Sequence, residues 1–254
     1  MNRVPPDVVK SLAPAGRLRA AINVANPVLV QTDSSGAPGG VTVDLARELA
    51  RRLGVALDPV VIDGAGKSFE AVKAANCDIG FLAVEPARSA DIDFTAPYVI
   101  IEGVYAVRAD SALKANADVD RAGVRVAVNK GAAYDLYLTR SLKHAALVRA
   151  ESAFDVFKRD GLDVVAGVKQ AVVRLAQANP GVRVLDGRFM EIQQAMCLPK
   201  GRDAAARYLR GFVEEMKASG FVAEALRRAN QPDAAVAPAA GVCRLERGNH
   251  GDRR

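Results

Sequence analysis

The stretch EPARSADIDFTAPY, residues 85–98, places one arginine, Arg88, between an apolar run and a charged run. The apolar run, CDIGFLAV at residues 77–84, is hydrophobic on both faces, which is typical of a strand in a parallel sheet covered on both sides. Taken alone, Arg88 has an ordinary interpretation as a surface cation paired with Asp91 or Asp93. The alternative is that the guanidinium binds an anionic ligand. The rest of the sequence helps to decide between these two interpretations.

The segments before this stretch alternate between strand-like and helix-like patterns. RLRAAINVA at 17–25 and VALDPVVI at 55–62 are apolar enough for strands. Between them, VTVDLARELARRLG at 41–54 has an apolar stripe at helical spacing and ends at Gly54, a typical C-terminal stop. A short helix is expected over 67–76. This order predicts an α/β fold.

The segments after the stretch repeat the pattern and then change. We expect a strand, a glycine turn and a helix over 123–142, with further strands and helices to about residue 230. Two long apolar segments, near 99–107 and 190–198, look like connections between two units. Residues 1–16 are interpreted as an arm with a short helix at 6–12. Residues 232–254, rich in alanine and proline and then in charge, are predicted to be disordered.

Composition excludes several classes of protein. The 254 residues carry a net charge of +6, but the basic residues are scattered and lack interleaved aromatics, so we expect no nucleic-acid partner. Three cysteines without a CxxC pair and only two histidines argue against a zinc site or a Cys–His nucleophile. We expect no metal, no cofactor and no membrane insertion, since no apolar run reaches about 18 residues. The N-terminus lacks an apolar signal region, so either the protein is cytoplasmic or an export segment has been removed.

Taken together, these segments resemble the solute-binding proteins of ABC transporters in the polar amino-acid-binding family, over roughly residues 17–230. The strongest matches are GVTVDLARELARRLG at 40–54 and EPARSADIDFTAPY, whose family counterparts read like GFDIDLAKALAKRLG and TPERAKxVDFSxPY. The resemblance implies a periplasmic-binding-protein type 2 fold with two lobes and two hinge-crossing strands. Lobe 1 would be residues 17–103 plus 198–231, and lobe 2 would be residues 104–197.

The same resemblance implies a function and a place for it. A monomer would trap a small solute between the lobes and deliver it to an ABC permease in the periplasm. In the family, the arginine matching Arg88 forms a bidentate pair with the ligand carboxylate. Backbone N–H groups in the turn of Gly131, Ala132, Ala133 and Tyr134 would hold the same anion at a helix start. The hydroxyls usual at residues 132 and 133 are missing here.

Other positions depart from the family pattern and make this chain an atypical member. Val168 stands where amino-acid binders have an aspartate for the ligand ammonium, and a buried ammonium without a carboxylate costs several kcal/mol. We therefore expect a small anionic solute, a carboxylate or a planar heterocyclic anion, rather than a standard α-amino acid. The remaining predicted ligand-binding residues are neutral or apolar apart from one glutamate: Asn23, Asn26, Phe81, Ala83, Glu85 and Gln194.

Three alternatives remain open from the sequence. Glu85 or Glu102 offers another partner for an ammonium, which would restore amino-acid binding. The missing signal favours a cytoplasmic ligand sensor. The family also contains cyclohexadienyl dehydratases, in which a cleft glutamate such as Glu85 or Glu102 would be a general acid. We expect binding without catalysis, because no nucleophile–base pair or phosphate loop is evident.

Overall fold

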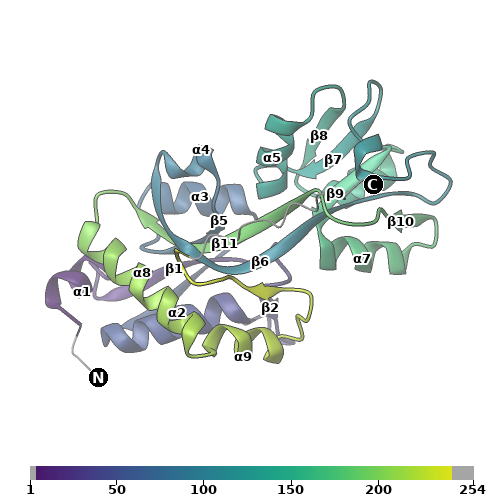
Figure 1. Ribbon diagram of the computed structural model, residues 1–254. Coiled ribbons are helices and arrows are strands. Elements are labelled where there is room, and N and C mark those ends of the chain that lie inside the picture. The colour runs from purple at the N-terminus through teal and green to yellow at the C-terminus, as the bar shows by residue number, and fades with distance from the viewer. Residues whose placement is uncertain (1–3, 242–254) are drawn as a thin grey trace, which may run out of the picture.

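Two long antiparallel strands, β6 (Ile92–Arg108) and β11 (Met190–Pro199), carry the chain between the two lobes of the molecule (Figure 1). The structure is a computed structural model and describes residues 4–241. The two predicted crossings are confirmed, although β6 begins well before residue 99. Its first residues include FTAPY, residues 94–98, which form part of the extended strand. Pro97 has no N–H for the ladder, and the β6–β11 register shifts beside its partner Ala195.

The first lobe is built around short strands beside this pair. β1 (Arg17–Asn23) pairs in parallel with β4 (Ala56–Ile62), and a single bridge from Ala20 to Ile79 links them to β5 (Gly80–Ala83), which pairs with β11. The predicted helix is confirmed as α2 (Val41–Leu53), and Gly54 ends it in the left-handed conformation. The other elements here are β2 (Gln31–Thr32), β3 (Pro38–Gly39), α3 (Ala65–Lys73) and α4 (Pro86–Ser89).

The second lobe continues the same sheet across β6. β9 (Val164–Val168) is antiparallel to β6 and parallel to β7 (Arg125–Asn129), which in turn pairs with β8 (Ala146–Ala150). Fully buried valines and alanines of β7 and β9 form its core, as expected for strands covered on both faces. The other elements are η1 (Asn116–Asp118), α5 (Ala133–Ser141), α6 (Ala153–Arg159), α7 (Lys169–Ala178) and β10 (Val182–Val184).

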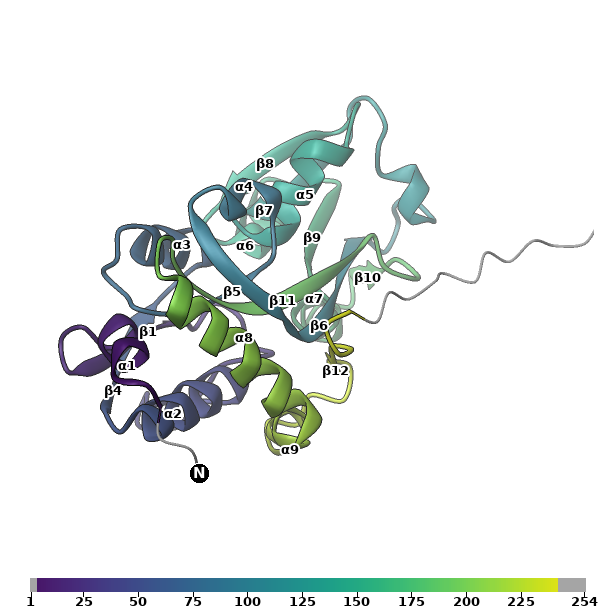
Figure 2. The same cartoon turned by 60° about the vertical axis from the view of Figure 1, so that its left-hand side comes forward.

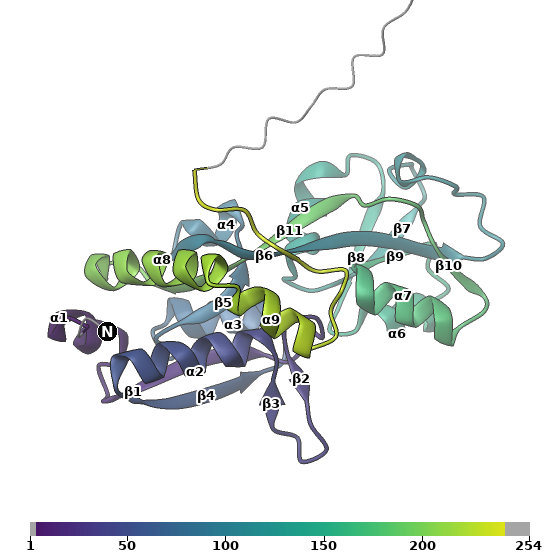
Figure 3. The same ribbon diagram turned by 60° about the horizontal axis from the view of Figure 1, so that its bottom comes forward.

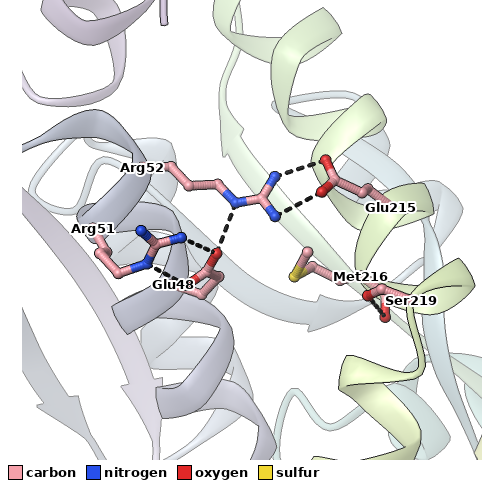
Figure 4. A network of polar contacts seen from close by, with 6 residues as sticks. All are labelled: Glu48, Arg51, Arg52, Glu215, Met216 and Ser219. Carbon is pink, nitrogen blue, oxygen red and sulfur yellow. Dashed lines mark hydrogen bonds and ion pairs between the residues drawn. The ribbon is translucent and has the colours of Figure 1, made fainter. Parts of the chain in front are cut away.

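The chain then returns to the first lobe as α8 (Asp203–Ala218) and α9 (Phe221–Arg228), and α2 lies between these helices and β1–β4 (Figure 3). A charge network ties α2 to α8 (Figure 4). The Arg52 guanidinium donates to Glu48 at 2.8 Å and to both oxygens of Glu215 at 2.7 and 2.8 Å. Arg51 also pairs with Glu48, and the two guanidinium groups lower the pKa of the Glu48 carboxyl to about 2.

Both ends of the described chain pack against the first lobe. The predicted N-terminal helix is α1 (Pro6–Leu12), which buries Leu12 and receives a hydrogen bond from Arg202 to the Ser11 carbonyl at 2.9 Å. The prediction of disorder from residue 232 is wrong for 232–241. There, β12 (Ala235–Val236) pairs with β6, while residues 242–254 lie outside the described part of the chain. Within residues 4–241, no helix combines the length and apolarity needed to cross a membrane.

The low pKa of Glu48 predicts a specific acid sensitivity. Because the pKa falls from its ordinary 4.5 to about 2 on folding, the carboxylate stabilises the fold fully above pH 4.5 and loses that effect as pH falls through 2. Glu48→Gln should therefore flatten the fall in unfolding free energy between pH 4.5 and 2, measured by urea denaturation. Glu70→Gln, at an exposed glutamate of α3, should keep the wild-type slope. Identical slopes for wild type and Glu48→Gln would contradict the role of the network.

Candidate functional site

A cavity of about 260 Å³ lies between the two lobes and is lined by residues of both. Its walls come from the ends of β1, β4 and β5 on one side and of β7, β8 and β9 on the other. Most of the predicted site residues border it: Asn23, Asn26, Phe81, Ala83, Arg88, Ala132, Ala133, Tyr134, Val168 and Gln194. Glu85 and Gly131 do not. The structure thus brings these residues together at one cavity, while their role in binding stays a prediction.

Arg88 is buried at the cavity, just beyond the end of β5. Only 2% of its surface is exposed, so the interpretation as a surface cation is wrong. Its Nη1 donates to the Ala83 carbonyl at 3.1 Å, and its Nη2 donates to the Gly131 carbonyl at 2.8 Å. The first acceptor belongs to its own lobe and the second to the other lobe. Asp91 is instead paired with Lys73.

The charge of Arg88 has no carboxylate within ion-pair distance among residues 4–241. Burial lowers the pKa of its guanidinium, since desolvation outweighs the favourable field of Glu85. Two of its five N–H groups are occupied by the carbonyls, which leaves three for another acceptor. A buried cation without a counter-charge is costly, so the arrangement is suited to an anion that arrives from the cavity.

The turn after β7 offers fewer free donors than predicted. The Gly131 N–H donates to the Asp135 carboxylate at 2.9 Å, and the Ala132 N–H donates to the Asn129 carbonyl at 3.1 Å. The prediction that all four amides are free for an anion is therefore wrong for these two. Asp135 is itself paired with Arg149 at 2.8 Å. Ala133 and Tyr134, in the first turn of α5, keep the amides that a helix start leaves without intrahelical partners.

The two glutamates considered as cleft acids point to other partners. The Oε2 atom of Glu85 lies 2.7 Å from Nη2 of Arg140. The two side chains form an ion pair, but their relative orientation does not allow a hydrogen bond to Oε2. This contact brings α4 beside α5 across the lobes (Figure 2). Glu102 is bound by Lys169 at 2.7 Å, and this hydrogen bond lowers the pKa of its carboxyl. Neither carboxylate is among the residues that line the cavity, so the geometry gives no support to the alternatives in which one of them serves there as an acid or as an ammonium partner.

The amide side chains at the cavity mainly offer donors. Oδ1 of Asn23 accepts from the amides of Ala25 and Gly64, each at 3.1 Å, and Oδ1 of Asn26 accepts from Val28 at 3.2 Å. Because Oδ1 of each side chain already accepts a hydrogen bond, the NH2 groups remain available to donate to a ligand. Gln194 is only 6% exposed, and its side chain has no hydrogen-bond partner in the described part of the chain. It is therefore an adaptable polar group at the cavity wall.

Sequence reasoning missed several residues of the cavity. The charged ones are Asp63, Lys130 and Glu151, all exposed, and the remaining ones are Ala25, Pro27, Gly64, Ala65, Leu82, Asn129, Phe154, Gly167, Ala171 and Ile192. Asp63, Lys130 and Glu151 each follow the end of a strand, β4, β7 and β8, where ligands of open α/β sheets bind. Their position directly after a strand was the signal in the sequence from which these three residues could have been predicted. Glu151 forms an exposed ion pair with Lys67 at 3.2 Å across the lobes, which contributes little stability.

The backbones of the two lobes lie close together at two glycines, Gly66 and Gly131. Gly131 has a positive φ of 72°, and a Cβ on it would lie 3.2 Å from the Cα of Gly66 in α3. A side chain on Gly131 would therefore crowd Gly66, and the same close approach places the Gly131 carbonyl against Arg88.

Gly131→Ala should therefore destabilise the fold through both backbone strain and crowding. The matched control is Gly123→Ala, where φ is 88° but no atom lies within 4 Å of the added Cβ. Each variant should lose about 1 kcal/mol or more from the unfavourable φ, and Gly131→Ala should lose additional unfolding free energy in urea. Equal losses would show that the contact between the glycines does not constrain the structure.

Comparison with known proteins agrees with this architecture. The family model for bacterial extracellular solute-binding proteins, family 3, matches residues 18–230. An arginine-binding protein mutant from T. maritima has 24% identity and a TM-score of 0.74, covering 88% of this chain and 99% of its own. The receptor for L-cysteine of Neisseria gonorrhoeae has 22% identity and a TM-score of 0.77, with coverages of 88% and 94%.

A third solved structure is the ancestral amino acid-binding protein AncCDT-1, described as a precursor of cyclohexadienyl dehydratase. It has 22% identity and a TM-score of 0.71, covering 87% of this chain and 98% of its own. At these identities the structures establish the two-lobe fold. No match was found among curated protein sequences. The family match over most of the chain confirms the resemblance seen in the sequence: the protein belongs to the bacterial extracellular solute-binding proteins of family 3.

Proposed function

We propose that the protein binds a small organic anion between its lobes and delivers it to an ABC-type permease. One observation carries this proposal: the Arg88 guanidinium is buried at the cavity with two backbone carbonyls as partners and no carboxylate within ion-pair distance in residues 4–241. A ligand carboxylate would supply the missing charge and accept from the remaining N–H groups. The free amides of Asn23 and Asn26 and the start of α5 favour the same sign of ligand.

The lining favours an anion over an α-amino acid. Val168 borders the cavity at the position where the family resemblance would place an acidic partner for an ammonium. The acidic residues that do line it, Asp63 and Glu151, are exposed, and Glu151 is already paired with Lys67. A zwitterionic ligand would thus find no buried carboxylate for its ammonium among the described lining residues, and burying an unpaired ammonium costs several kcal/mol. In its class of ligand, this protein would therefore differ from the solved relatives that are named for arginine and cysteine.

The enzyme alternative has less support. AncCDT-1 connects this fold with a dehydratase, but Glu85 and Glu102 are held by Arg140 and Lys169 away from the cavity. We propose a monomeric binding protein that works outside the cytoplasm, as the family description indicates. A cytoplasmic ligand sensor would share the same site, and detecting the native protein in periplasmic or cytoplasmic fractions would distinguish the two.

Arg88→Met tests the proposed anion site. Wild type should bind deaminated acids, such as 4-methylpentanoate and glutarate, better than the matching amino acids leucine and glutamate, measured by calorimetry. Loss of charge-assisted hydrogen bonds should weaken carboxylate binding about 10- to 100-fold in Arg88→Met. The control is Arg183→Met, because Arg183 also donates to backbone carbonyls, those of Ser111 and Leu113, away from the cavity. Unchanged affinity in Arg88→Met would refute the site, and Arg88→Lys substitutes if the methionine variant does not fold.

Val168→Asp tests the discrimination against amino acids. The new carboxylate would stand at the cavity wall and offer a partner to an ammonium. The variant should gain affinity for leucine by about tenfold or more over wild type and lose affinity for 4-methylpentanoate, because the added charge repels a second anion. Val168→Asn, a neutral polar control, should not show this exchange. Wild-type preference for leucine, or an unchanged preference in Val168→Asp, would show that residue 168 does not decide the ligand class.

A further inference from the structure

We infer that the bound anion is a monocarboxylate with an apolar body, aryl or branched alkyl, clamped between Phe81 of one lobe and Phe154 of the other. Phe154 is then a specificity-determining residue. This inference rests on the proposed function, since it assumes that Arg88 holds a carboxylate in the same cavity. It goes further by naming what the rest of the ligand must be.

The first observation is how charge is distributed around the cavity. Among the described lining residues Arg88 is the one buried charge, whereas Asp63, Lys130 and Glu151 are exposed. Apart from Arg88 and Gln194, the buried lining is hydrophobic and includes Phe81, Leu82, Ala83 and Ile192. A dicarboxylate would leave its second charge without a buried partner. One anionic end and an apolar body fit this lining, and Gln194 leaves room for one neutral polar group.

The second observation is that Phe81 forms a preset wall. It lies on β5, is 4% exposed, and its ring meets the ring of Tyr98 edge to face, with centroids 6.2 Å apart and planes at 87°. Tyr98 is fully buried in β6. Because the neighbouring ring fixes its orientation, Phe81 presents an apolar surface that needs little reorganisation when a ligand packs on it.

The third observation concerns Phe154 on the opposite lobe. It lies in the first turn of α6, is only half-buried, and lines the cavity. A Cβ added to Gly167 in β9 would lie 3.5 Å from Cζ of the ring and 2.9 Å from Cγ2 of Val172. The ring therefore packs directly beside the backbone of β9 at residue 167, where even an added Cβ would make only an ordinary van der Waals contact with it. A partly exposed aromatic ring at a cavity gains stability when an apolar group covers it.

The test compares ligands that differ only in the body. Full-length wild-type protein is titrated by calorimetry with 3-phenylpropionate, 4-methylpentanoate, acetate and glutarate. 3-Phenylpropionate and 4-methylpentanoate should bind at least about tenfold more tightly than acetate and glutarate, because they bury additional apolar area. Phe154→Ala should lower the affinity for 3-phenylpropionate by about tenfold or more and leave the affinity for acetate unchanged. Phe154→Leu, which keeps an apolar side chain without the ring, should weaken it less and serves if the alanine variant does not fold.

Phe221→Ala is the matched control, because Phe221 is a half-buried phenylalanine of α9 that does not line the cavity. It should keep wild-type affinities. Binding of 3-phenylpropionate that depends on Arg88 but not on Phe154 would overturn this inference and leave the proposed function standing. Glutarate or acetate binding as tightly as 3-phenylpropionate would do the same. Absence of binding by every carboxylate would overturn the proposed function and this inference with it.

Discussion

The guanidinium of Arg88, held out of water between two backbone carbonyls, is the constraint around which the cavity is arranged. Ala83 supplies one carbonyl at the end of β5, and Gly131 supplies the other from the turn after β7. That second bond requires the backbone of the second lobe to come within reach, which the pair of glycines at residues 66 and 131 permits. The bond therefore links the position of the charge to the relative position of the lobes. An anion that binds the remaining N–H groups would stabilise both the position of the charge and the relative position of the lobes.

The hinge strands hold this arrangement with charges of their own. Glu102 on β6 is directly opposite Glu191 on β11, an unfavourable cross-strand pair by itself. Arg188 compensates it by pairing with Glu102 at 3.2 Å and with Glu191 at 2.8 Å, and Lys169 from α7 binds Glu102 as well. Glu102, one of the two glutamates that the sequence offered as a possible general acid, is thus part of an ion-pair network at the junction between the lobes.

Much of the fold followed from local patterns. The apolar stripe of residues 41–53 and the stop at Gly54 defined α2, and the runs near 99–107 and 190–198 marked the crossings, because period and length are properties of a short segment. The segment 232–241 was missed because its strand depends on a distant edge of β6, to which an alanine- and proline-rich sequence gives no local signal. Similarly, the engagement of the Gly131 amide depends on how the Asp135 side chain turns, which spacing alone does not specify.

The location of Arg88 and Val168 at the cavity was predictable, because each lies at or just after the end of a strand and aligns with a position of the family pattern. Phe154 was missed because its ring reaches the cavity through the packing of α6 beside β9, a relation between segments that the local sequence does not specify. A high-resolution crystal structure of the protein with 3-phenylpropionate is the most direct test. It should show a carboxylate about 2.7–2.9 Å from free N–H groups of Arg88 and the phenyl ring between Phe81 and Phe154. A cavity holding only water at saturating ligand, or the carboxylate turned away from Arg88, would contradict this arrangement.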